Sequence, residues 1–172
     1  MSDSVHSILD HAGLDREQAT GLVAEALKGA DDGELYLEHA QSEGLVFDNG
    51  RLKSASFDTS QGFGLRAVSG EAAGYAHSGE VSVEAIRRAS DAVQAVKTGH
   101  TGTYAEPPPR TNRKLYGDES PLQAPSFAEK VKLLEEIDAY ARAKDPRVRQ
   151  VTASLAGSHS IVEILRAAGN LV

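Results

Sequence analysis

Hydrophobic and polar residues alternate with a period of two over much of the stretch from Glu34 to His77. Leu35 and Leu37, for example, have polar or charged neighbours, a pattern typical of a half-buried strand. Polar and glycine-containing breaks divide the stretch, and Asn49-Gly50 suits a tight hairpin turn because both residues tolerate positive φ. The pattern predicts an antiparallel meander of about five short strands, over 34–38, 45–47, 51–57, 63–68 and 72–77.

A period of 3.6 residues marks three other segments as amphipathic helices. Asp15 is a suitable N-cap for the first helix, and Gly29 a suitable stop. Ser82 can cap a second helix that runs to about residue 97. Ser126 and Glu129 form a capping box for a third helix, which ends before Pro146. The predicted buried stripes are Ala19, Leu22, Val23, Ala26 and Leu27; Ile86, Ala89, Val93 and Val96; and Phe127, Val131, Leu134, Ile137 and Ala141.

Strand periodicity returns after Pro146. We predict a strand from Val151, a turn at 157–159, a further strand over 160–167 and a hairpin turn at 168–170. Because the return strand of this hairpin would hold only two residues, we expect the chain to be a fragment. Strand runs are not separated by single crossover helices, which favours an α+β fold over a doubly wound sheet.

The predicted fold is therefore α+β, with an antiparallel β-meander packed against about three amphipathic helices and a C-terminal β-hairpin that is cut short. The expected organisation is a flexible tail at 1–13, an N-terminal α+β domain at 14–145 and the hairpin at 147–172, which leads into a further domain. A proline-rich loop at about 100–125 belongs to the middle part.

Composition narrows the function classes. Eighteen basic and twenty-five acidic residues give a net charge of −7, which disfavours binding to phosphate backbones, so we predict no direct nucleic-acid partner. The absence of cysteine excludes disulfides and thiolate metal sites within this chain and is compatible with a cytoplasmic protein. No apolar run approaches the roughly 20 residues that a membrane-spanning helix needs, so no membrane partner is predicted.

Three stretches together resemble the N-terminal part of a known family. The stretches are 34–48, 60–76 and 130–157, and their order and spacing are similar to those of the TldD/PmbA metallopeptidases, once labelled modulators of DNA gyrase. The resemblance runs from about Gly13 to Val172. It is stronger to the TldD branch of the family, particularly around Asp145-Pro146-Arg147.

This resemblance implies an activity that lies outside the chain itself. Full-length family members are zinc metallopeptidases that cleave unfolded or leader-type peptides and pair with a PmbA-like partner subunit as a heterodimer. Their chemistry depends on a later His-Glu-x-x-x-His motif, in which two histidines hold the metal and the glutamate activates its water. The chain has no such motif. We therefore assign no catalytic, metal or cofactor residue within it and expect the fragment alone to be inactive.

The histidines of the chain offer only incomplete alternatives. His6 and His11 have the spacing of the histidines in that motif, but Ser7 stands where the glutamate would be. His159 and Glu163 would share one face of a strand, with no third ligand nearby in the sequence. We interpret these residues as surface groups.

Glycines are concentrated in the second half of the meander. The segment Gln61–Gly64 superficially resembles a phosphate-binding turn, but a strand rather than a helix follows it. The glycines can serve bulges, turns and close backbone approach, or an exposed edge here can accept an extended peptide as an added strand. On the second interpretation the candidate peptide-binding residues are Gly62, Gly64, Arg66, Gly70 and Tyr75.

Two functions remain open from the sequence. The chain can be the scaffold and peptide-guiding wall of a TldD-like zinc metallopeptidase. Alternatively, it can be a non-catalytic module that binds a peptide or docks a partner subunit, as a gyrase modulator would. The residues that follow Val172 distinguish the two, because the first function requires the metal-binding motif there.

Overall fold

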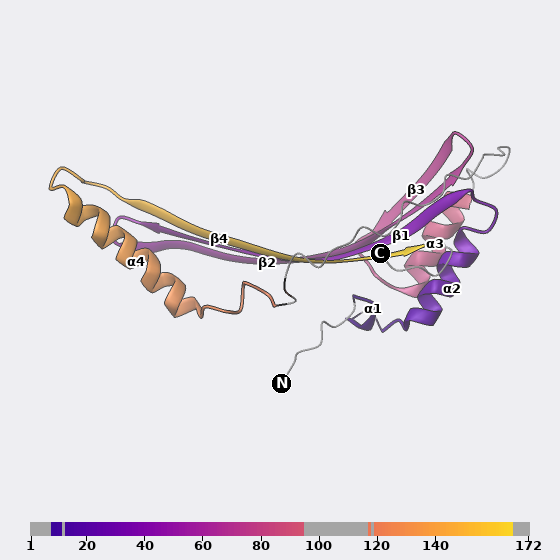
Figure 1. The fold of residues 1–172 in the computed structure, drawn as a ribbon, viewed down its shortest axis with the longest axis horizontal. Helices are drawn as coiled ribbons and strands as arrows, with labels where there is room; N and C mark the ends of the chain where they lie inside the picture. The colour runs from indigo at the N-terminus through magenta and orange to yellow at the C-terminus, as the bar shows by residue number, and fades with distance from the viewer. Residues whose placement is uncertain (1–7, 12, 95–116, 118, 167–172) are drawn as a thin grey trace. The chain divides into compact units, whose positions relative to one another are not determined.

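The computed structural model describes residues 8–11, 13–94, 117 and 119–166 (Figure 1). Four strands form one antiparallel sheet in the order β3-β2-β1-β4, and four helices accompany it, which confirms the predicted α+β class. The elements are α1 (Ile8–His11), α2 (Arg16–Ala26), β1 (Asp32–Asp48), β2 (Arg51–Ser69), β3 (Ala72–Ser78), α3 (Val83–Gln94), α4 (Phe127–Lys144) and β4 (Thr152–Arg166).

The chain divides into two compact units. Unit 1 comprises Met1–His39, Ser60–Gly117 and Ile161–Val172, and unit 2 comprises Ala40–Thr59 and Asp118–Ser160. Strands β1, β2 and β4 each contribute one segment to each unit, whereas β3 belongs to unit 1 alone. Each unit has its own hydrophobic core.

The predicted count of five short strands in the meander is wrong, because three long strands replace them. The polar segments at 41–44 and 58–60 continue β1 and β2 without a turn. Polar side chains do not interrupt the main-chain ladder, whereas positive φ angles do reverse the chain. The predicted turn at Asn49-Gly50 is confirmed, with φ angles of 52° and 81°, the combination of a two-residue hairpin.

The predicted turn at 157–159 is also wrong, since β4 runs through it as a continuous strand. A Cβ atom at Gly157 would lie 2.8 Å from a methyl carbon of Leu122. The glycine therefore makes room for a packed side chain instead of reversing the chain. The predicted hairpin turn at 168–170 lies outside the described residues, as do most of the predicted loop at 100–125 and the predicted end of the second helix.

The core of unit 1 forms where helices α2 and α3 cover one face of the sheet. Asp15 caps α2 as predicted, its Oδ1 accepting the amide of Gln18 at 2.7 Å. Ser82 caps α3 through the amide of Ala85 at 3.1 Å. Helix α3 packs against β3 and α2. The buried residues that α2 and α3 contribute to this core are Ala19, Val23, Ala26, Ala85, Ile86, Ala89 and Val93.

Residues 8–11 contribute a short helix to unit 1. We expected a flexible tail over residues 1–13, but residues 8–11 form the short helix α1, where Ile8 and Leu9 are buried in the core of unit 1. The amide of Leu14 donates to the carbonyl of Leu9 at 2.9 Å, which closes this turn. Two large apolar side chains are enough to hold the segment against the core.

The core of unit 2 is smaller and consists of Leu45, Phe47 and Leu134, with partly buried neighbours from β2, α4 and β4. The predicted capping box of α4 is present, with Ser126 and Glu129 bonding each other's amides. Hydrogen bonds from Ser126, first from its side chain and then from its backbone amide, hold the pKa of the Glu129 carboxyl below its ordinary value.

The predicted apolar stripe of α4 is wrong at two positions. Phe127 is 56% exposed and Ile137 is 43% exposed, whereas Lys130, Leu134 and Asp138 are buried. Lys130 can be buried because its ammonium pairs with Glu43 and donates to the Leu122 carbonyl at 2.6 Å.

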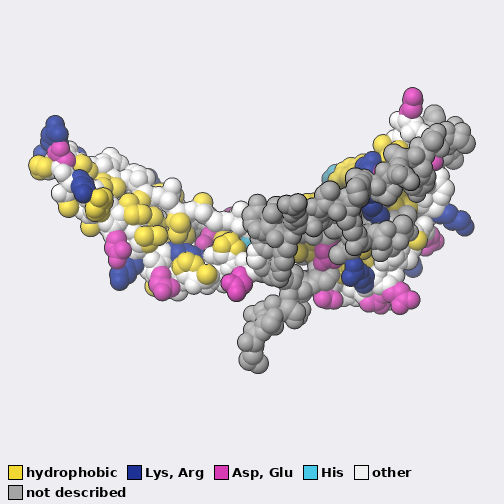
Figure 2. All heavy atoms as spheres, viewed as in Figure 1, with side chains coloured by type: hydrophobic (Ala, Val, Ile, Leu, Met, Phe, Trp, Pro, Cys, Tyr) yellow, Lys and Arg dark blue, Asp and Glu magenta, His cyan; other side chains and the backbone are white. Residues whose placement is uncertain are grey.

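Asp138 is paired in turn with Arg142 at 2.8 Å. Hydrophobic side chains are gathered over the region of α4 in Figure 2. Leu133 and Tyr140 of this helix are exposed. Among the described residues, no helix has both the length and the hydropathy of a membrane span.

Alanine substitutions on α4 should distinguish its buried face from its exposed one. Leu134→Ala should lower the free energy of unfolding by about 2–5 kcal/mol because it leaves a cavity in the core of unit 2. Ile137→Ala should cost roughly 1 kcal/mol or less because much of its side chain already contacts water. Urea denaturation followed by circular dichroism measures both. Equal losses in the two variants would contradict this assignment of the buried face.

Candidate functional site

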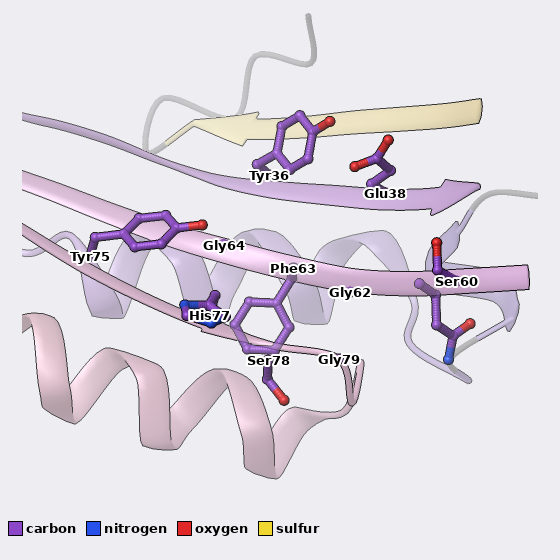
Figure 3. Close-up of a pocket in the computed structure, with 11 residues that line it drawn as sticks. Tyr36, Glu38, Ser60, Gly62, Phe63, Gly64, Tyr75, His77, Ser78 and Gly79 are labelled. Atoms are coloured by element: carbon purple, nitrogen blue, oxygen red, sulfur yellow. The ribbon is translucent and has the colours of Figure 1, made fainter.

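The candidate site lies on the face of β1, β2 and β3 that points away from the helical core of unit 1 (Figure 3). Strand alternation creates this face, since Leu35 and Leu37 are buried in the core while Tyr36 and Glu38 point the other way. A hollow of about 330 Å³ lies there. Its lining residues are Tyr36, Glu38, Ser60, Gln61, Gly62, Phe63, Gly64, Tyr75, His77, Ser78 and Gly79.

Tyr75 crosses the hollow above Gly64, as Figure 3 shows. A Cβ atom at Gly64 would lie 2.6 Å from the Tyr75 hydroxyl, so only glycine leaves room for the ring in this position. The register pairs Gly64 with His77 and Arg66 with Tyr75, so the tyrosine ring reaches diagonally across the strand pair. Tyr75 stacks on His77 with 5.7 Å between ring centroids and remains 67% exposed.

Tyr36 and Glu38 form the β1 side of the hollow. The pKa of the Tyr36 hydroxyl is raised, first by burial and then by the negative charge of Glu38 and the hydrogen bond between the two side chains. The phenol is therefore neutral at physiological pH and donates to the carboxylate. The pair presents an aromatic face and an acidic group beside each other.

Arg66 and Gly70, two of the predicted peptide-binding residues, do not line the hollow. The Arg66 guanidinium binds Glu34 with two hydrogen bonds, of 2.6 and 3.0 Å, and contacts Asp32 at 3.1 Å. These bonds, led by the one to Glu34, raise the pKa of Arg66. Gly70 has a φ of +60° in the turn after β2, and its amide donates to Asp31 at 2.6 Å.

The other three predicted residues, Gly62, Gly64 and Tyr75, all line the hollow. A Cβ atom at Gly62 would lie 2.8 Å from the carbonyl oxygen of Ser78, so both glycines of the Gln61–Gly64 segment allow close approach. Whether these residues bind peptide stays a prediction.

Sequence reasoning missed Tyr36, Glu38 and His77 as members of the site. The sequence signal for Tyr36 and Glu38 was their alternation with the buried leucines of β1. The strand order then brings β1, β2 and His77 on β3 side by side.

Strand β3 lies at one edge of the described sheet, beside this hollow. The Val68 carbonyl accepts the amide of Asp31 at 2.7 Å, so the main chain of Val68 faces away from β3. By the alternation of an antiparallel ladder, the main-chain groups of Ala73, Tyr75 and His77 then point away from β2. Among the described strands, none lies beyond β3. This edge can therefore accept another strand.

The histidine and glutamate pairs considered from the sequence form no metal site among the described residues. Glu163 accepts the amide of Ile8 at 2.6 Å, which gives its carboxylate a structural partner. His6 lies outside the described residues, and only the backbone of His11 is described.

No group of three or more His, Cys, Asp or Glu side chains in the described part of the chain could hold a metal ion. These residues therefore do not fit a catalytic metal, and we assign them no catalytic step.

Comparison with family models identifies the family to which this chain belongs. Residues 33–97 match PmbA/TldA metallopeptidase domain 1, and residues 120–172 match the PmbA/TldA metallopeptidase central domain. The chain belongs to the PmbA/TldD metallopeptidase family, which confirms the resemblance found in the sequence.

Three curated relatives carry the description metalloprotease TldD homolog. Those from Buchnera aphidicola subsp. Schizaphis graminum and subsp. Acyrthosiphon pisum are 31% and 32% identical, over 82% and 83% of this chain and 29% and 30% of their own lengths. The one from Haemophilus influenzae is 31% identical over 84% of this chain and 30% of its own length. The chain thus spans less than a third of the length of these relatives.

Solved structures share the fold at lower sequence identity. A protein described as a proposed modulator of DNA gyrase, from Bacteroides thetaiotaomicron, matches with a TM-score of 0.67 and 14% identity over 90% of this chain and 37% of that one. TldE from Thermococcus kodakarensis matches with a TM-score of 0.66 and 17% identity over 90% of this chain and 36% of that one.

The raised pKa of Tyr36 gives a direct test of the site geometry. Glu38→Gln should lower this pKa, because it removes the negative charge, but should not return it fully to the ordinary tyrosine value, because burial is the larger cause. A titration that follows phenolate absorbance, compared with the control variant Glu135→Gln, measures the change. An unchanged Tyr36 pKa in Glu38→Gln would contradict the contact between the two side chains.

Proposed function

We propose that this chain is the N-terminal part of a TldD-like metallopeptidase that cleaves unfolded or leader-type peptides. In that protein it acts as a scaffold and as a wall that guides the peptide to a catalytic centre in another region. Family membership supports the metallopeptidase class, and the description of the relatives supports the TldD type. The observation that carries the guiding role is the position of β3 at the edge of the described sheet, beside the hollow.

Strand addition on β3 suits substrates of varied sequence. Main-chain hydrogen bonds at Ala73, Tyr75 and His77 would hold an extended peptide whatever its side chains are. An unfolded peptide has its own main-chain groups free for these bonds, whereas a folded protein does not. The edge therefore selects for extended, unstructured chains.

In the proposed enzyme, the ligands of the metal are residues other than those described. Zinc is the metal that the family resemblance implies, and the described residues hold no cluster for it. When bound, zinc would supply an activated water, and this chain's residues would supply binding and orientation of the peptide. The proposed enzyme pairs with a partner subunit similar to TldE. It is located in the cytoplasm and does not bind nucleic acid directly.

The reading frame beyond Val172 tests the catalytic part of this proposal. Sequencing of the coding region should show a downstream His-Glu-x-x-x-His motif, because this motif would supply two of the zinc ligands and the glutamate that activates the bound water. A complete frame without that motif would refute the catalytic assignment and favour a non-catalytic binding module.

Proline at one edge position tests strand addition. His77→Pro removes a main-chain donor that points away from β2, so the β2–β3 ladder stays intact while an added strand loses a hydrogen bond. We expect binding of a fluorescein-labelled, unstructured peptide of alternating Ser and Val to weaken roughly fivefold or more. Fluorescence anisotropy with the 172-residue chain measures it.

His77→Ala is the matched control, since it loses the ring but keeps the amide, and it should bind this neutral peptide nearly as well as the unsubstituted chain. Circular dichroism of all three proteins checks their folding. Equal binding by His77→Pro and His77→Ala would leave β3 without a role in holding the peptide.

A further inference from the structure

We propose that the hollow on unit 1 binds a cationic side chain, lysine or arginine, of a peptide held along β3. This inference rests on the proposed function for the peptide and goes beyond it by naming a substrate class. It predicts that the chain favours peptides with a basic residue over otherwise equal neutral peptides.

Two aromatic rings make the hollow suitable for a cation. Tyr36 and Tyr75 both line it, and they are 36% and 67% exposed. The face of a tyrosine ring attracts an ammonium or guanidinium group because the ring quadrupole is negative there. Tyr75 keeps its position through the space above Gly64 and its stacking on His77.

The charge of the hollow has the sign that a cation requires. Among the lining residues in the described part of the chain, Glu38 is the one carboxylate, and there is no lysine or arginine. On the same face, the Arg66 guanidinium is already bound by Glu34 and Asp32. Glu38, Glu34, Asp32 and Arg66 together carry more negative than positive charge, so this group of side chains favours a cation over an acidic peptide.

The hollow also lies where a side chain of an added strand can reach it. Tyr75 and His77 line the hollow and also present outward main-chain groups of β3. Alternate side chains of a strand that pairs with β3 lie on the same face as these two residues. A long, flexible lysine or arginine side chain on that face can extend across Tyr75 toward Glu38.

Two matched peptides test the charge preference. The 172-residue chain is titrated with a labelled, unstructured Gly-Ser peptide that contains one central lysine, and with the same peptide carrying norleucine instead. Norleucine keeps the aliphatic stem and removes only the charge. We expect the lysine peptide to bind about tenfold more tightly. Equal affinities would overturn the inference while leaving peptide binding, and thus the proposed function, intact.

Variants locate the effect in the hollow. Glu38→Gln and Tyr75→Leu should remove most of the tenfold preference, and Gly64→Ala should reduce it because the new methyl group displaces the Tyr75 ring. The matched controls are Glu135→Gln, Tyr140→Leu and Gly44→Ala, which lie in unit 2; Tyr140 is 64% exposed, close to the value for Tyr75. A preference that survives in both Glu38→Gln and Tyr75→Leu would overturn the assignment to this hollow.

A small cation separates failure of the inference from failure of the proposed function. Butylammonium chloride is titrated into the labelled chain and followed by NMR, with butanol as the neutral comparison. Shifts of the Tyr36 and Tyr75 ring signals with butylammonium alone, lost in Glu38→Gln, support the cation site even if neither peptide binds. No shift with butylammonium overturns the site, whatever the peptides do.

Discussion

The two-residue turn at Asn49-Gly50 is the constraint on which both units depend. Its positive φ angles fix how β1 pairs with β2, and both strands then continue from unit 2 into unit 1. Buried residues of β1 in both units, from Leu35 to Phe47, lie at odd-numbered positions. Because side chains alternate along a strand, a slip of one residue would expose these side chains in both cores at once. A short turn therefore controls the register of two hydrophobic cores.

Local chemistry predicted the helix caps and the hairpin turn well. Asp15, the Ser126–Glu129 box and Asn49-Gly50 all act where the sequence indicates, because a cap or turn depends on residues within a few positions. Long-range packing was not visible in the same way. Whether Gly157 bends the chain or admits Leu122 depends on a contact that no local pattern encodes. The predicted apolar stripe of α4 was wrong in part for a similar reason, since the burial of Lys130 depends on its partner Glu43, which is distant in the sequence.

The candidate site was predictable in part. The cluster of glycines around Gln61–Gly64 and the nearby Tyr75 pointed to strands that line the hollow, because glycine in a strand often marks close approach. Arginine is a residue type common in binding sites, but the Arg66 guanidinium is already bound by two carboxylates from β1. Tyr36 and Glu38 could not be placed from the sequence, since their approach to Tyr75 follows from the order of three strands.

The buried ion pair of unit 2 has an evolutionary consequence. Lys130 is 5% exposed and is held by Glu43 and the Leu122 carbonyl, so the loss of either charged partner alone would leave the other without compensation. Single changes at these positions are then selected against, whereas a paired change to two well-packed apolar residues is tolerated. Across divergent relatives, positions 43 and 130 are expected to covary, and this covariation would mark unit 2 in sequences where the apolar stripe of the helix is too weak to recognise.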